Sequence, residues 1–156
     1  MTAKTVPVAH IALAAADPLA VEQWYSEHFG FARTRVYDPG PEQVVMVGNG
    51  QLELEIFRAT GERPDGAPTE AGPLYPGWRH LAFVVADLDA TLAGLGDTAR
   101  LTLGPLDMRQ YVAGMRVAWV ADPAGNIVEL NQGYVAESTP PTLAGDLART
   151  AGAATS

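Results

Sequence analysis

The fold of this chain is decided by a stretch that occurs twice, first as VAHIALAAAD (residues 8–17) and then as WRHLAFVVAD (residues 78–87). His10 aligns with His80, and the closing Ala-Asp pair aligns as well, without a gap. A segment repeated at a fixed offset is typical of a duplicated structural unit. A histidine that is copied with its strand predicts one site shared between two halves. Metal binding is therefore the first hypothesis.

Each copy opens the same pattern of one strand, one helix and three further strands. In the first half, residues 7–14 alternate like a strand, and Asp17-Pro18 predicts a helix start with aspartate as the N-cap. Gly30 predicts the end of that helix. Turn residues then separate three further predicted strands, at residues 31–37, 43–47 and 51–57.

The second half repeats this plan after a segment rich in glycine and proline. Asp87 predicts the cap of the second helix. The predicted strands are residues 78–85, 100–103, 115–120 and 127–132. The predicted fold is thus α+β, with two tandem βαβββ modules. The expected boundaries are a first module at 6–57, a linker at 58–77, a second module at 78–134 and a disordered tail at 135–156.

Carboxylates share a strand face with each histidine. Side chains two apart on a strand point the same way, so Glu53 and Glu55 lie on one face of their strand, opposite its apolar residues. Glu129 lies likewise on the last strand, on the same face as Asn131. A charge on an interior face is costly unless it is paired or bound to a metal. The neighbours of the histidines are alanines, which leave room above the sheet.

Composition limits the functional classes. The 156 residues contain 47% apolar and 18% charged residues, which is typical of one globular domain. A net charge of −8 argues against a nucleic-acid partner. The chain has no cysteine, so histidines and carboxylates must hold any metal, and Zn, Ni, Co, Mn and Fe suit them. The sequence shows no leader pattern and no long apolar run, so we expect a soluble cytoplasmic protein without membrane contact.

Five segments together resemble the vicinal oxygen chelate superfamily, over roughly residues 6–134. That superfamily contains glyoxalase I, methylmalonyl-CoA epimerase, extradiol dioxygenases, and the fosfomycin and bleomycin resistance proteins. The resemblance is carried by AHIAL (9–13), by WY (24–25) with FGF (29–31), by LEIF (54–57), by RHLAF (79–83), and by DPAGNIVEL (122–130). It implies two modules that curl a mixed sheet around a cleft, and a homodimer.

The resemblance also implies a ligand set and a reaction. His10, His80 and Glu129 match the metal ligands of the lyase and epimerase members. The fourth ligand is Glu55 or Glu53, and we favour Glu55. The implied enzyme is a glyoxalase I-like lyase or isomerase. A substrate with two adjacent oxygens would chelate the metal and form an enediolate, while Glu55 or Glu129 moves the proton as base.

Other readings stay open on the same residues. An extradiol-type dioxygenase would use only His10, His80 and Glu129 on Fe(II). A metal-free protein of the bleomycin-binding type would sequester a small molecule in its cleft. The sequence does not separate a lyase from an epimerase. Arg109 could bind a substrate carboxylate, and Glu53 could lie near the cleft mouth.

Overall fold

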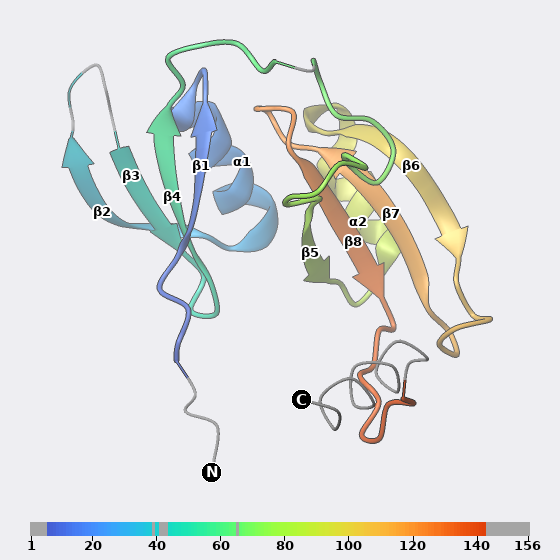
Figure 1. Ribbon diagram of the computed structural model, residues 1–156. Helices are drawn as coiled ribbons and strands as arrows, with labels where there is room; N and C mark the ends of the chain where they lie inside the picture. Colours follow the sequence, from blue (N-terminus) through green and yellow to red (C-terminus); the bar gives the residue numbers. More distant parts are fainter. Residues whose placement is uncertain (1–5, 39, 41–43, 65, 143–156) are drawn as a thin grey trace, which may run out of the picture.

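The computed structural model describes residues 6–38, 40, 44–64 and 66–142, and it contains two modules of the same build (Figure 1). The first module consists of β1 (Ile11–Ala15), α1 (Pro18–Phe29), β2 (Ala32–Asp38), β3 (Val44–Gly48) and β4 (Glu53–Arg58). The second consists of β5 (Leu81–Val84), α2 (Leu88–Leu95), the 3₁₀ turn Gly96–Thr98, β6 (Arg100–Asp107), β7 (Arg116–Ala121) and β8 (Ile127–Gln132). The predicted α+β fold of two tandem βαβββ modules is confirmed.

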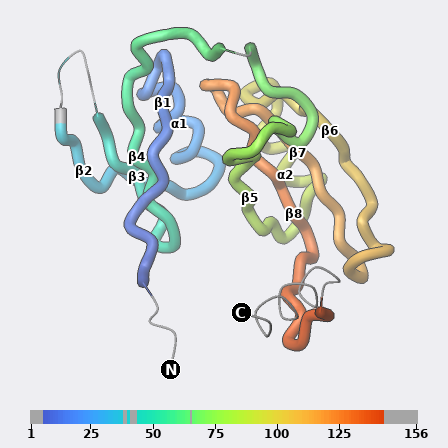
Figure 2. Tube along the Cα trace, in the orientation of Figure 1, coloured from blue at the N-terminus to red at the C-terminus, as the bar shows by residue number. Residues whose placement is uncertain are grey.

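Each module forms its own four-stranded mixed sheet. The strand orders are β1-β4-β3-β2 and β5-β8-β7-β6, so the first strand of each module lies at a sheet edge. β1 runs parallel to β4, β5 runs parallel to β8, and the other neighbours are antiparallel. The two sheets stand beside each other without closing into one barrel, and the linker passes from β4 to β5 (Figures 1 and 2).

The helix boundaries follow from capping residues, as predicted. Asp17 Oδ1 accepts hydrogen bonds from Leu19 N and Ala20 N at 3.1 and 3.2 Å. Gly30 ends α1 in the left-handed conformation, with φ of 68°, which glycine adopts without a steric penalty. Asp87 caps α2 through Ala90 N at 2.9 Å. The duplicated Ala-Asp pair therefore copies a helix start.

One hydrophobic core lies between the helix-bearing faces of the two sheets. It combines apolar side chains of both helices with those of the inner strands of both sheets. Phe29 of α1 stacks on Phe83 of β5 with ring centroids 4.4 Å apart, which joins the modules directly. Because both helix-bearing faces are used in this core, the opposite face of each sheet turns away from it. The two predicted histidine faces are these opposite faces.

The strand predictions differ from the structure at some ends. β1 and β5 begin at Ile11 and Leu81, so His10 and His80 directly precede their strands instead of lying within them. The reason is pairing, since β1 has only β4 as a neighbour and their register begins at Ile11 and Leu54. β6 extends to Asp107, past the predicted end at 103. Its register shifts accommodate a proline, which an edge strand tolerates.

The C-terminal segment, predicted as a disordered tail, is described only in its first part. Residues 135–142 carry no helix or strand, and residues 143–156 lie outside the described residues. No helix in the described ranges combines the length and the apolar character that crossing a membrane would require.

Candidate metal centre

The structure places one histidine–glutamate pair on each sheet. His10 Nε2 lies 3.2 Å from Glu55 Oε2, and His80 Nε2 lies 3.0 Å from Glu129 Oε2. The strand registers are the same, because Glu55 lies opposite Ala12 and Glu129 lies opposite Ala82. Each of these alanines follows its histidine by two residues. The two pairs are therefore copies of one arrangement.

This register separates Glu55 from Glu53. Glu55 is the positional equivalent of Glu129 and contacts His10. Glu53 begins β4 opposite Gly48 of β3, and within the described residues it forms no ion pair with His10. The geometry thus brings His10 together with Glu55, the candidate favoured from the sequence.

The His80 ring is oriented by the linker. Its Nδ1 lies 2.7 Å from the carbonyl oxygen of Ala71, and a carbonyl only accepts hydrogen bonds, so Nδ1 carries the proton. In the neutral ring, Nε2 then presents a lone pair to the Glu129 carboxylate. Two lone-pair atoms at 3.0 Å repel each other unless a proton or a metal cation lies between them. Metal-ligating histidines typically donate their other ring nitrogen in this way, so this donor pair fits a divalent metal.

A second side chain orients Glu129. Asn131 Nδ2 donates to Glu129 Oε1 at 2.8 Å, leaving Oε2 toward His80. Asn131 is 7% exposed, and its Oδ1 has no hydrogen-bond partner among the described residues. The indole Nε1 of Trp119, on the strand beside Glu129, is also buried without a partner in that part of the chain. Buried polar groups of this kind are uncommon and call for an explanation.

Sequence reasoning misses the roles of these two residues. Alternation puts Asn131 on the face of Glu129, and the i, i+2 spacing is the signal that could have assigned it a contact. The alternation around Trp119 predicts a core residue, and Trp119 is indeed buried, in a second, smaller apolar cluster on the face that carries Glu129. Its ring lies 6.2 Å from that of His80.

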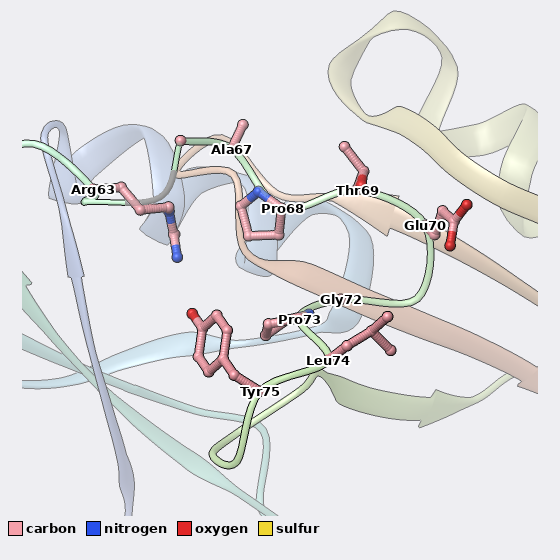
Figure 3. A pocket seen from close by; sticks show the side chains of 10 residues that line it. Arg63, Ala67, Pro68, Thr69, Glu70, Gly72, Pro73, Leu74 and Tyr75 are labelled. Atoms are coloured by element: carbon pink, nitrogen blue, oxygen red, sulfur yellow. The ribbon is translucent and has the colours of Figure 1, made fainter.

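The linker packs against the His80 pair. Arg79 Nε donates to the Ala71 carbonyl oxygen at 3.2 Å, beside the His80 contact. Gly72 adopts φ of 100°, and a Cβ at this position would lie 2.2 Å from the Arg79 carbonyl oxygen. A small cavity of about 290 Å³ opens within the linker, where Arg63 and Tyr75 point inward (Figure 3). None of the four predicted metal ligands lines that cavity.

The four predicted ligands do not meet within one chain. In the described residues, no group of three or more histidines and carboxylates is placed to hold a metal. The predicted ligands are therefore present as two separate pairs. The third histidine, His28 of α1, lies apart from both pairs and contacts Thr98 Oγ1 through Nε2 at 2.9 Å.

Arg109, the candidate for binding a substrate carboxylate, is engaged locally. Its Nε donates to Asp107 Oδ2 at 2.6 Å, and its side chain is 77% exposed. Hydrogen bonds from Arg109 lower the pKa of Asp107 to about 2. The structure thus gives Arg109 an acidic partner on its own loop, next to the exposed end of the β6–β7 hairpin.

Comparisons with known proteins agree with the fold of two modules. The model of the Glyoxalase/Bleomycin resistance protein/Dioxygenase superfamily matches residues 8–130. A glyoxalase family protein from Enterococcus faecalis is similar at 30% identity, with 80% of this chain and 96% of that chain covered and a TM-score of 0.58. Comparison with curated proteins finds no match.

Two more distant structures share the fold. The fosfomycin resistance protein FosX from Listeria monocytogenes has 12% identity and a TM-score of 0.62, over 85% of this chain and 97% of that chain. A glyoxalase I mutant from Zea mays has 18% identity and a TM-score of 0.58, over 80% and 46%. The family match extends over both modules. This chain therefore belongs to the Glyoxalase/Bleomycin resistance protein/Dioxygenase superfamily.

Proposed function

We propose that the protein is a metal-dependent enzyme of the glyoxalase I type, a lyase or isomerase that acts on a small molecule with two adjacent oxygens. The observation that carries this proposal is the pair of register-equivalent contacts, His10 with Glu55 and His80 with Glu129. Two imidazoles and two carboxylates form a ligand set that suits a divalent Zn, Ni, Co, Mn or Fe ion.

The proposed centre forms between two copies of the chain. The two pairs lie on sheet faces that turn away from the shared core, so one chain does not bring them together. β1 and β5 are edge strands, and exposed edges are suited to pairing with another chain. Val84 of β5 is 72% exposed, which supports a partner there. In a twofold dimer, the first pair of one copy would face the second pair of the other, twice.

Each group has a task in the proposed reaction. A divalent metal bound there would act as a Lewis acid that polarises a substrate carbonyl and stabilises the negative charge on two adjacent oxygens. The histidines hold fixed positions as ligands. One glutamate removes the proton from one of the two neighbouring carbons that carry those oxygens and returns it to the other carbon, so the substrate is isomerised without an external reductant or oxidant.

A dioxygenase is the second candidate. Glu129 has an additional hydrogen-bond partner, whereas Glu55 has only His10 in the described part of the chain. A site with only His10, His80 and Glu129 would leave positions open for a catechol and oxygen on Fe(II). Uptake of oxygen by the Fe(II)-loaded protein when a catechol is added would support this candidate. A metal-free binding protein is disfavoured, because it would need neither of the two histidine–glutamate pairs.

We also propose that the protein is located in the cytoplasm.

Elemental analysis of the purified protein tests the proposal. We expect stoichiometric divalent metal, and isomerase turnover of a 2-oxoaldehyde thiol adduct that is lost with a chelator and restored by Ni, Zn, Co or Mn. His10→Ala and His80→Ala should each lose metal, while His28→Ala, which removes the Thr98 contact, should keep it. Protein without metal that gains no turnover on adding these ions would contradict the proposal.

A further inference from the structure

We infer that Asn131 is a positioning residue that fixes the Glu129 carboxylate, so that Glu129 stays a ligand and Glu55 is the carboxylate free to transfer the proton. This inference rests on the proposed function and deepens it. It assigns different tasks to two glutamates that occupy equivalent positions in the two modules.

Both oxygens of Glu129 are occupied. Oε1 accepts from Asn131 Nδ2 at 2.8 Å, and Oε2 faces His80 Nε2 at 3.0 Å. The Glu129 side chain is 13% exposed, and the His80 ring is held in turn by the Ala71 carbonyl oxygen at 2.7 Å. A carboxylate and an imidazole that are each fixed by a second partner form a preorganised half-site.

The equivalent half-site in the first module lacks these supports. Asn131 lies opposite Val84, and the position opposite the equivalent Ala14 is Phe57, whose ring cannot donate a hydrogen bond. Glu55 therefore has His10 as its only polar partner in the described residues. The His10 side chain is 40% exposed, against 21% for His80. The duplicated modules have thus diverged in how tightly they hold their carboxylates.

This asymmetry between the two half-sites gives Glu129 and Glu55 different roles. A carboxylate that takes a proton from one carbon and delivers it to the next must move between the two positions, and a bond from Asn131 opposes such movement. Glu55 has no such bond. Metal affinity should then depend more on Glu129 and Asn131, and proton transfer should depend on Glu55.

Titration of the metal-free protein with Co²⁺, followed by calorimetry and by the visible absorption of the bound ion, tests the inference. Asn131→Leu keeps the branched shape of the side chain and removes the donor. We expect Asn131→Leu and Glu129→Gln each to weaken Co²⁺ binding by about 10- to 100-fold. Glu55→Gln should weaken it by less than about 10-fold and should change the absorption less. Phe57→Leu is the matched control and should bind as the wild type does.

The reverse substitution provides an independent arm. Phe57→Asn places a donor beside Glu55 at a 39% exposed position, and it should tighten Co²⁺ binding and slow turnover. If Asn131→Leu fails to fold, Phe57→Asn and the comparison of Glu55→Gln with Glu129→Gln still test the inference. Equal losses of Co²⁺ affinity in Glu55→Gln and Glu129→Gln, or an unchanged Co²⁺ affinity in Phe57→Asn, would overturn this inference but not the proposed function. A wild-type protein that binds no Co²⁺ would overturn the proposed function with it.

Discussion

The Tyr25 hydroxyl donates a hydrogen bond of 3.1 Å to Asp122 Oδ2, which joins the first helix to the turn between the last two strands. Both residues are buried, and they belong to different modules. The same carboxylate accepts from Ala124 N at 2.9 Å and Asn126 N at 2.8 Å, which shapes the β7–β8 turn. Asp122 therefore connects local turn geometry to the packing of the two modules, whose opposite faces carry the histidines.

Removing the hydroxyl should weaken this connection. Tyr25→Phe keeps the ring in the core but leaves the buried Asp122 carboxylate with one donor fewer. We expect the free energy of unfolding to fall by about 1.5–3 kcal/mol, as for hydrogen bonds to charged groups. Urea denaturation measures it. Tyr111→Phe is the control, because Tyr111 is 74% exposed, and it should change stability little. Equal stability of both variants would contradict the role of this contact.

Asp122 should also make stability depend on pH. Burial raises the pKa of Asp122 above its ordinary value of 3.8, although hydrogen bonds from Asn126, Ala124 and Tyr25 oppose the shift. The folded state then binds this proton more tightly than the unfolded state does. Its contribution is fully present below pH 3.8 and is lost as pH rises through the raised pKa.

The measurement compares the wild type with Asp122→Asn by urea denaturation at several pH values from about 3.5 upward. The difference in unfolding free energy isolates this carboxylate from groups with opposite shifts, such as Asp107. We expect the wild type to lose stability relative to the variant as pH rises. A difference that does not change with pH, or one that changes in the opposite direction, would show that burial does not control this group.

Gly72 should be needed for the linker to reach His80. Its φ is 100°, and a Cβ there would lie 2.2 Å from the Arg79 carbonyl oxygen, so Gly72→Ala must shift the backbone beside Ala71. We expect a loss of about 1–3 kcal/mol in unfolding free energy and weaker metal binding. Gly61→Ala is the control, because a Cβ there meets no atom within 4 Å. If both variants behave alike, the linker does not orient the histidine.

The two candidate glutamates of β4 should differ in metal binding. Glu55 contacts His10, whereas Glu53 lies opposite Gly48. We therefore expect Glu55→Gln to weaken metal binding measurably and Glu53→Gln to leave it within about twofold of the wild type, a change of under about 0.5 kcal/mol. Calorimetric titration of both variants measures this difference. A larger loss of metal affinity in Glu53→Gln than in Glu55→Gln would show that Glu53, and not Glu55, is the ligand on β4.

The modules are predictable from the sequence because their signals are local. Asp17 and Asp87 cap helices within three residues, and Gly30 ends α1 through its own backbone conformation. Alternation along β4 and β8 puts Glu55 and Glu129 on the faces of the histidines, because side-chain direction has a period of two. These features need no knowledge of the partner strand.

The rest depends on contacts distant in sequence. The ends of β1 are set by its pairing with β4, which local alternation does not contain. The contact from Ala71 to His80 depends on the path of an irregular linker. The separation of the ligands into two pairs depends on how two helix-bearing faces share one core. Pattern within one strand carries no information about that packing.

Complementation between two double variants tests the shared centre most directly. One variant combines His10→Ala with Glu55→Ala, the other combines His80→Ala with Glu129→Ala, and neither should bind metal tightly alone. If the centre joins the first pair of one copy to the second pair of another, mixed dimers regain one intact site. Co-expression should then restore about one quarter of the wild-type metal content, given random pairing of a twofold dimer. The wild type, measured in parallel, should bind metal. If it does and the co-expressed mixture contains as little metal as either variant alone, the shared centre is contradicted.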